Sequence, residues 1–308
     1  MRTAAVVVSW EGGEPTRRCV RSLLAQDRPP AEVVVVDNAS GVAEREALRA
    51  AFAGEPRVRL LLLDENRQFA GGLNAGGRAA LAAGADRVLF LNNDTVLEPD
   101  ALGRLEDALE ARPGAGIAGP RVRDLARRGA VLSAGERHDL KLLCLPRTLL
   151  RYRRPPETPY RVSGVMGCAL LVSRACFEAV GGFSEQIEVY YEDVDFCLGA
   201  AAAGFAAVLE PRAVVWHDGI RGFARGLTPW AAYLKARNPW LVVRRHGGLA
   251  DWLAFVPTYG AMLAASLGLW ALRGEGAVVR ALGRGAVAGV RGALGARVRP
   301  AGAPRRGA

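Results

Sequence analysis

The sequence predicts an α/β fold, a doubly wound and mostly parallel sheet flanked by helices, with a helical apolar and basic extension at its C-terminal end. Two observations support this prediction. Short β-branched runs alternate with helical stretches as far as Ala111, and right-handed crossovers place such strands parallel in one sheet. Beyond residue 240, long uncharged apolar stretches are followed by scattered arginines.

Each expected strand is short and apolar, which is typical of strands buried on both faces of a parallel sheet. The strands expected in the first half are Thr3–Val8, Glu32–Val36, Val58–Leu63 and Arg87–Leu91. The helices expected to follow them are Thr16–Leu24, Glu44–Phe52, Gly72–Ala83 and Pro99–Ala111. The last has proline in its first turn, where the missing N–H costs nothing. Later in the chain, Val162–Val172 is predicted as one buried strand.

Polar residues follow the strands where ligands of such sheets bind, beyond the carboxyl ends. The residues at these positions are Ser9, Trp10, Asp37, Asn66 and Asp94. Any one of these ends could be an ordinary turn, because Asp and Asn bond to their own backbone. Three acidic or amide ends on one side of a sheet favour a nucleotide site. No G-x-G-x-x-G follows the first strand, which argues against a standard dinucleotide fingerprint.

The segment Tyr190–Cys197 places three carboxylates within four residues: Glu192, Asp193 and Asp195. Such a cluster is costly to fold around, because like charges repel and burial penalises each of them. A metal, a proton to abstract or a cationic partner would balance that cost. A solvated helix N-terminus is the alternative, since acidic side chains favour that end of the helix dipole.

Composition limits the classes of function. The 308 residues fit one large or two modest domains, and the net charge of +10 comes almost entirely from arginine. This charge suits nucleic acid, anionic lipid headgroups or phosphorylated substrates. The five cysteines are odd in number and contain no Cys-x-x-Cys pair, which favours a reducing cytosol over a disulfide framework or zinc site. No signal peptide is expected at the start.

Several blocks, in order, carry a resemblance to a known family. They are Val33–Ser40, Asn66–Gly76, Leu89–Thr95, Gly181–Glu185, Tyr191–Asp195 and Val214–His217. From about Thr3 to about Asn238 the chain resembles family 2 glycosyltransferases of the GT-A fold, in the bacterial rhamnosyltransferase-like branch. With this resemblance, the expected divisions are a catalytic domain (1–240), a helical extension (241–299) and a disordered tail (300–308). Within the domain we expect a nucleotide-sugar half (1–120), an insertion (121–160) and an acceptor half (161–240).

The resemblance implies a role for each matching position. A nucleotide-sugar pocket would be formed by Ser9, Trp10, Glu11, Asp37, Asn66, Gly72, Asn74, Asn92 and Asn93. Asp94 would bind a divalent metal, Mg²⁺ or Mn²⁺, with His217 completing the shell. Asp193 would be the general base of an inverting displacement, and Glu192 its neighbour or an acceptor contact. Asp195 is expected to be structural.

Two positions depart from the family pattern. Glu11 stands where the family usually has Asn, which leaves the nucleotide contacts at that corner open. Asn92 stands where many members have Asp, which removes one charge near the diphosphate. One carboxylate with one histidine suits Mn²⁺ somewhat better than Mg²⁺.

The expected function is therefore inverting, metal-dependent transfer of a sugar from a nucleoside-diphosphate donor. The resemblance suggests rhamnose from dTDP-rhamnose, moved to a saccharide or polyprenyl-linked saccharide in cell-envelope polysaccharide synthesis. A sugar nucleotidyltransferase is one alternative, although Glu11–Pro15 is a poor triphosphate loop. A non-catalytic basic protein binding membrane or nucleic acid is another, but aromatic residues do not interleave with the basic ones, so no nucleic-acid partner is expected.

Two segments keep more than one interpretation. The insertion carries arginines that are either solvated or touch acceptor phosphates or lipid headgroups, and its His138 is expected at the surface. The uncharged stretch Trp252–Leu272 could pack on the domain, lie on an anionic membrane with the arginines that follow, or span a bilayer. The expected location is the cytoplasm, at the cytoplasmic face of the cell membrane.

Overall fold

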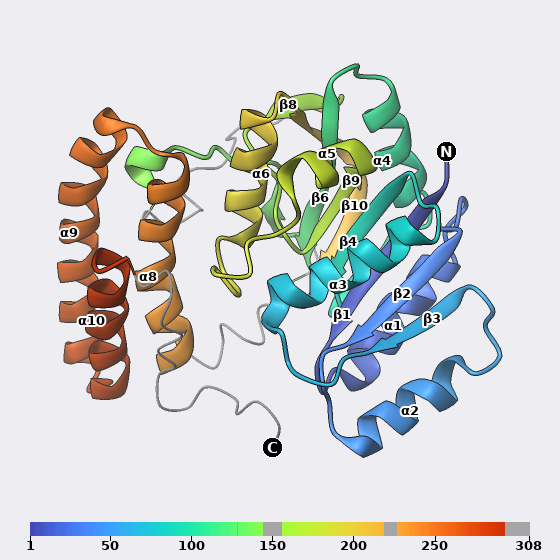
Figure 1. Cartoon of the computed structure of the whole chain (residues 1–308), viewed down its shortest axis with the longest axis horizontal. Coiled ribbons are helices and arrows are strands. Elements are labelled where there is room, and N and C mark those ends of the chain that lie inside the picture. The colour runs from blue at the N-terminus through green and yellow to red at the C-terminus, as the bar shows by residue number, and fades with distance from the viewer. Residues whose placement is uncertain (128, 144–155, 219–226, 293–308) are drawn as a thin grey trace.

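A ten-stranded sheet with helices on both faces forms the larger part of the molecule, and long C-terminal helices pack beside it (Figure 1). This computed structural model describes residues 1–127, 129–143, 156–218 and 227–292. The predicted α/β sheet with a C-terminal helical extension is confirmed. The expected disordered tail 300–308 and the insertion arginines Arg147, Arg151, Arg153 and Arg154 lie outside the described residues.

The strands and helices follow the predicted alternation closely. The strands are β1 (Thr3–Ser9), β2 (Glu32–Asp37), β3 (Val58–Leu62), β4 (Arg87–Asn92), β5 (Thr95–Leu97), β6 (Ala115–Asp124), β7 (Val131–Ser133), β8 (Tyr160–Val162), β9 (Ala169–Ser173) and β10 (Ala206–His217). The helices are α1 (Gly13–Leu24), α2 (Val42–Phe52), α3 (Gln68–Ala82), α4 (Ala101–Glu110), η1 (Leu140–Leu142, 3₁₀), α5 (Arg174–Val180), α6 (Glu192–Ala202), α8 (Pro229–His246), α9 (Leu249–Leu272) and α10 (Gly276–Val290).

The strands join in the order β3-β2-β1-β4-β9-β6-β10-β5, with β7 against β6 and β8 against β10. The first four are parallel, and β9 then pairs antiparallel with both β4 and β6. In the parallel part, Ser9 is opposite Asp37, and Val8 is opposite Asn92. The ends of β1, β2 and β4 therefore meet at one edge of the sheet, as the sequence predicted.

The expected single strand Val162–Val172 is wrong. Residues 160–162 form β8 and residues 169–173 form β9, and the two pair with different neighbours. The loop between them contains Gly164 and Gly167, and both glycines lie where an added Cβ would collide with a neighbouring side chain. An apolar stretch does not show which of its residues leave the sheet, and this loop reaches into the candidate site described below.

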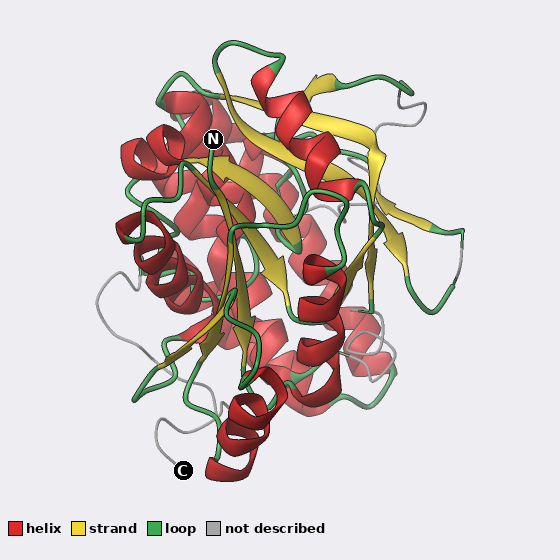
Figure 2. Cartoon of the chain, turned by 90° about the vertical axis from the view of Figure 1, so that its right-hand side faces the viewer, coloured by secondary structure: helices red, strands yellow, loops and turns green. Residues whose placement is uncertain are grey.

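Alternate residues of the central strands enter two separate cores. Val6 and Val8 of β1 face the core beneath α3, α5 and α6, whereas Ala5 and Val7 face the core beneath α1, α2 and α4. Figures 1 and 2 show helices on both sides of the sheet. An added Cβ at Gly76 of α3 would lie 2.4 Å from Cγ1 of Val6, so this glycine lets α3 pack directly on β1. Each fully buried valine stabilises the fold by about 1.5–3 kcal/mol.

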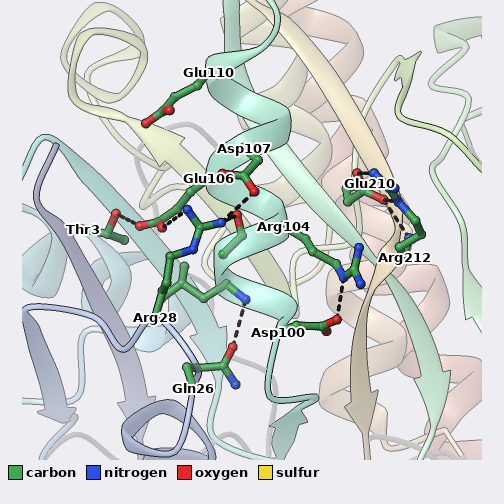
Figure 3. Close-up of polar contacts among 12 residues, drawn as sticks. Thr3, Gln26, Arg28, Asp100, Arg104, Glu106, Asp107, Glu110, Glu210 and Arg212 are labelled. Carbon is green, nitrogen blue, oxygen red and sulfur yellow. Dashed lines mark hydrogen bonds and ion pairs between the residues drawn. The ribbon is translucent and has the colours of Figure 1, made fainter.

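Helix α4 is fixed to the sheet by polar contacts (Figure 3). Thr3 at the start of β1 donates to Glu106, and Nη2 of Arg28 lies 2.7 Å from Oδ2 of Asp107. The side-chain oxygen of Gln26 accepts a 2.9 Å hydrogen bond from the backbone N–H of Leu102. The exposed Arg28 pair contributes little to stability, so the buried contacts hold the helix.

The C-terminal helices form a unit beside α6. The expected boundary between residues 240 and 241 falls inside α8, so the helical part of the chain begins at Pro229. Only Phe255 and Tyr259 of α9 are buried. Among the described residues, α9 is the one helix long and apolar enough to cross a membrane, judged by length and composition alone. Its exposed large apolar residues are Leu249, Leu253, Val256, Leu269 and Leu272.

Candidate active site

The ends of β1 and β4 meet over the start of α1. The hydroxyl of Ser9 lies 2.8 Å from that of Thr16, which also accepts a 3.0 Å bond from Nδ2 of Asn93. An added Cβ at Gly12 would lie 2.3 Å from both Asn93 and Thr16, so only glycine fits there. The structure thus brings together the expected Ser9 and Asn93. Thr16, which the sequence placed only in a helix, is the group that joins them.

Glu11 connects the loop after β1 to the loop after β2. Its carboxylate accepts a 2.6 Å bond from the N–H of Gly41, and its own N–H donates to Ser40 Oγ at 2.9 Å. The carboxylate of Glu44, on α2, accepts a 2.8 Å hydrogen bond from the N–H of Gly13. The departure at Glu11 thus has a local explanation, because the carboxylate holds two loops together. Beside it, Trp10 is 47% exposed and open at the surface.

Asp37 is enclosed. Its side chain is fully buried, 2.8 Å from Nε of Arg45, and it accepts a weak bond from the N–H of Ser40. Asp37, which was expected in the nucleotide-sugar pocket, is therefore already paired within the fold. Since Arg45 compensates the buried charge, its removal would leave an unpaired carboxylate, which is strongly destabilising. No sequence motif indicated this partner.

The glycine-rich segment is helix, not turn. Asn66 accepts a 2.8 Å bond from the N–H of Gln68 at the start of α3. An added Cβ at Gly72 would lie 2.7 Å from Val8, so this glycine serves packing against β1. Asn74 is buried and exchanges two 2.8 Å bonds with the backbone of Phe183. Gly72 and Asn74, both expected in the nucleotide-sugar pocket, are thus packed and hydrogen-bonded inside the fold.

Asn92, Asp94 and His217 converge at the junction of β4, β5 and β10. Nε2 of His217 lies 3.2 Å from Oδ1 of Asp94 and 3.3 Å from Nδ2 of Asn92. The Oδ1 atoms of Asn92 and Asp94 are buried and accept no hydrogen bond in the described part of the chain. A divalent cation would satisfy both, and an amide, a carboxylate and an imidazole suit Mn²⁺.

No group of three His, Cys, Asp or Glu side chains that could hold a metal occurs among the described residues. The protein therefore offers few ligands of its own at this junction. Mg²⁺ and Mn²⁺ sites of nucleotide enzymes commonly retain waters and substrate phosphates for the remaining positions. The residues present fit a cation that is held jointly by the protein and a diphosphate.

Two consecutive residues, Gly167 and Cys168, connect Asp193 to this junction by hydrogen bonds. Oδ2 of Asp193 accepts a 2.8 Å bond from the N–H of Gly167, and the following carbonyl, of Cys168, accepts a 3.0 Å bond from the N–H of Asn92. The pKa of the Cys168 thiol is raised, mainly by burial and further by the charges of Asp94 and Asp193. Both carboxylates therefore lie within electrostatic range of this thiol, and the two-residue bridge Gly167–Cys168 links Asp193 to Asn92.

The three carboxylates of the acidic cluster face different partners. The second oxygen of Asp193 accepts a 2.8 Å bond from the N–H of Val194, in the first turn of α6. Glu192 is buried, and its charge adds to the burial that raises the pKa of Tyr190. Asp195 pairs with Nε of Arg245 and Nε2 of His246, each at 2.8 Å. This pairing agrees with the structural role predicted for Asp195.

A carboxylate from the insertion also approaches the site. Glu136 is buried and lies 3.2 Å from Nε2 of His138, and its charge contributes to the raised pKa of Cys168. The expectation that His138 lies at the surface is wrong, since only 4% of its side chain is exposed. An added Cβ at Gly164 would strike the imidazole ring, so the loop before β9 encloses it. The sequence around residue 136 carried no motif to indicate this.

The site combines an oriented carboxylate, a cluster of an amide, a carboxylate and an imidazole, and polar side chains at the ends of parallel strands. Such a set can remove a proton from an attacking hydroxyl while a charged leaving group is neutralised close by. These side chains lie in β1, β4 and β10, in the turn that follows β4, and at the start of α6.

Comparison with known proteins agrees with this arrangement. The model of the family described as "Glycosyltransferase like family 2" matches residues 2–242. The chain is 32% identical over 254 residues to an N-acetylglucosaminyl-diphospho-decaprenol L-rhamnosyltransferase of Mycobacterium tuberculosis, covering 76% of this chain and 80% of that protein. It is 25% identical over 224 residues to a dTDP-rhamnosyl transferase of Shigella flexneri, covering 70% and 71%.

Solved structures share the fold. A mannosyltransferase from Pyrobaculum calidifontis, in complex with GDP-Man and Mn²⁺, aligns with a TM-score of 0.57 at 21% identity. The alignment covers 94% of this chain and 87% of that one. Similarity therefore extends over the sheet and into the C-terminal helices.

Proposed function

Because the chain belongs to glycosyltransferase-like family 2, we propose that it is an inverting, metal-dependent rhamnosyltransferase. Its donor would be dTDP-rhamnose, and its acceptor a saccharide or a polyprenyl-linked saccharide of cell-envelope polysaccharide synthesis. The Mycobacterium and Shigella relatives, named as an L-rhamnosyltransferase and a dTDP-rhamnosyl transferase, support both choices. Membership of the family favours glycosyl transfer over nucleotidyl transfer and over a non-catalytic basic protein.

The observation that carries the proposal is the bridge Gly167–Cys168. It hydrogen-bonds Asp193 at one end and Asn92 at the other, and so fixes the base relative to the cation site. An inverting displacement requires such a fixed relation, because the hydroxyl must lose its proton on the face opposite the departing diphosphate.

Asp193 would accept the proton of the acceptor hydroxyl. One backbone N–H binds each of its oxygens, that of Gly167 at Oδ2 and that of Val194 at Oδ1. These two N–H groups hold the carboxylate in one orientation. Glu192, the preceding residue, would bind another hydroxyl of the acceptor.

Mn²⁺ or Mg²⁺ would be held by the side chains of Asp94 and His217 and by the side-chain oxygen of Asn92. When bound, the cation would neutralise the charge that develops on the leaving diphosphate. The complex of the Pyrobaculum mannosyltransferase with Mn²⁺ supports this choice of metal. The nucleotide would contact Ser9, Asn93 and the exposed face of Trp10. Asp37 and Asn66 would instead hold the neighbouring loops by hydrogen bonds to their backbone.

The outer face of α9 would rest on the cytoplasmic face of the membrane. Its exposed residues are uncharged from Leu253 to Leu272, and exposed arginines follow at Arg273, Arg280, Arg284 and Arg291. Apolar residues next to arginines are typical of helices that bind anionic lipid surfaces. An acceptor on a polyprenyl carrier would be reached from such a position.

The test is rhamnose transfer from dTDP-rhamnose to an N-acetylglucosaminyl-diphospho-prenol, with MnCl₂, and with the anomeric configuration of the product read by NMR. We expect an inverted product, and at least a thousandfold loss of transfer in Asp193→Asn. Asp107→Asn, a surface carboxylate on α4, is the matched control and should transfer like the wild type. Retention of configuration, or undiminished transfer by Asp193→Asn, would refute the mechanism.

A further inference from the structure

The loop before the proposed base is strained. Glu188, Tyr190 and Tyr191 adopt φ values of +67°, +64° and +73°, although none is glycine. A left-handed conformation is sterically unfavourable for residues other than glycine. Tyr191 directly precedes α6, whose first two residues are Glu192 and Asp193. Such a loop keeps one conformation only where surrounding groups impose it.

Helix α8 supplies those groups. Nδ2 of Asn238 lies within hydrogen-bond distance of three loop carbonyls, those of Ile187 (2.9 Å), Val189 (2.9 Å) and Tyr190 (2.8 Å). The Asn238 side chain is fully buried, and its Oδ1 accepts a 2.9 Å bond from Nε of Arg237. The amide nitrogen therefore binds the loop, while the amide oxygen is bound by the neighbouring Arg237 of the same helix.

Arg237 extends the contact along the loop. Its Nη2 donates to the carbonyls of Gln186 at 3.0 Å and Ile187 at 3.3 Å, and its Nη1 lies 3.6 Å from the carboxylate of Glu188. The side chain is 4% exposed. A buried guanidinium is costly unless it is paired and hydrogen-bonded, and here the loop provides the partners.

The same helix also contacts the first turn of α6. Arg245 and His246, at the C-terminal end of α8, bind the carboxylate of Asp195, two residues after the base. Eight residues separate Arg237 from Arg245, a rise of about 12 Å along a helix. Helix α8 thus fixes the chain on both sides of Asp193.

We propose that Arg237 and Asn238 are positioning residues for catalysis, which act by holding the left-handed loop that sets the place of Asp193. This inference rests on the proposed function, because it takes Asp193 as the base. It makes the helical unit a part of the catalytic machinery, acting through the backbone of residues 186–191 and not through contact with substrate.

A purely structural role would predict loss of stability and nothing more. Tyr259→Phe provides the matched comparison, because the Tyr259 hydroxyl donates a 2.7 Å buried bond to the carbonyl of Ala236, on the same helix, and not to a loop carbonyl. Asn238→Ala and Tyr259→Phe should both lower the unfolding temperature. Only Asn238→Ala should release the loop.

The experiment compares wild type, Asn238→Ala, Tyr259→Phe and Asp193→Asn at a temperature where all are folded. Transfer is measured from dTDP-rhamnose to an N-acetylglucosaminyl-diphospho-prenol, and amide hydrogen exchange is followed over residues 187–193. For Asn238→Ala we expect kcat to fall at least tenfold, the donor KM to change less than threefold, and exchange in the loop to rise. Tyr259→Phe should keep its kcat and its loop protection.

The outcomes separate the two proposals. If Asp193→Asn is inactive while Asn238→Ala keeps a kcat within threefold of Tyr259→Phe, or keeps its loop protection, the positioning role is refuted and the base stands. If Asp193→Asn transfers like wild type, both the base and its positioning are refuted. If wild type transfers no rhamnose from this donor to this acceptor, the proposed reaction is refuted. Unchanged hydrogen-exchange protection of the loop in Asn238→Ala would even then refute the proposal that α8 holds the loop.

Discussion

Gly167→Ala tests the geometry of the base directly. Gly167 donates the 2.8 Å bond to Asp193 Oδ2, and a Cβ added to it would lie 2.8 Å from Cβ, 3.0 Å from Oδ2 and 3.1 Å from Cγ of the same aspartate. The substitution adds one methyl group and no charge. It presses on Asp193 from the side of the bridge.

The size of the effect follows from these distances. Ordinary contact begins near 3.4 Å, so the aspartate must retreat by about 0.6 Å to accommodate the methyl group. Misplacement by about 1 Å can cost a hundredfold in rate. We therefore expect kcat to fall by roughly ten- to a hundredfold, which corresponds to about 1.4–2.7 kcal/mol in the activation free energy.

The assay is the rhamnosyl transfer described above, at saturating donor, with thermal unfolding measured in parallel. Gly283→Ala in α10 is the control, because a Cβ there meets nothing within 4 Å and should leave kcat unchanged. A Gly167→Ala enzyme with kcat within threefold of wild type would show that the position of Asp193 is not set by this bridge, or that Asp193 is not the base.

Three further predictions concern the cation site, the thiols and the membrane surface. In Asp94→Asn, MnCl₂ should no longer raise the unfolding temperature of the protein with dTDP, whereas wild type should gain several degrees that EDTA removes; equal gains would exclude Asp94 as a ligand. Burial raises the pKa of Cys19 and Cys176 from 9.0 to about 12. The folded state thus binds these protons more tightly, and stability that is complete below pH 9 is lost as the pH rises toward 12. At pH 10 the ionisation of both thiols should lower the free energy of unfolding, measured in urea, by about 3 kcal/mol. Cys176→Ala should lose less, and a loss as large as that of wild type would contradict this account. Finally, Leu253→Glu should weaken binding to phosphatidylglycerol vesicles at least tenfold, as burial of a leucine is worth about 2 kcal/mol. Val42→Glu, on an equally exposed valine of α2, should not, and equal effects would remove α9 as the contact.

The elements that sequence predicts well are those whose pattern is local. The β-branched runs at Thr3 and Glu32 gave their strands almost to the residue, because strands buried on both faces need continuous apolar side chains. The prediction of one strand over Val162–Val172 was wrong because it relied on the same local pattern. Its apolar pattern is continuous, but its two ends pair with different strands, and pairing is not a local property.

The same distinction applies to the site. A parallel sheet brings its strand ends together, so Ser9, Asn93 and Asp94 could be assigned to one edge from the order of elements alone. The enclosure of Asp37 by Arg45 could not be foreseen, because it depends on how α2 packs. Asn238 lies 45 residues after Asp193 in the sequence, and only the packing of α8 on the loop gives it a role.

The position of β9 has a consequence for how the molecule is made. In the sheet β9 lies between β4 and β6, yet it is synthesised after both. Until residues 169–173 emerge, β4 remains an open edge, and such edges are prone to pairing with other chains. The bridge Gly167–Cys168 immediately precedes β9, so the segment that closes this edge also places Asp193 against Asn92. We therefore expect closure of the sheet and assembly of the proposed catalytic centre to depend on the same segment, so that a chain in which β9 has not docked would expose the edge of β4 and lack the bridge to Asp193.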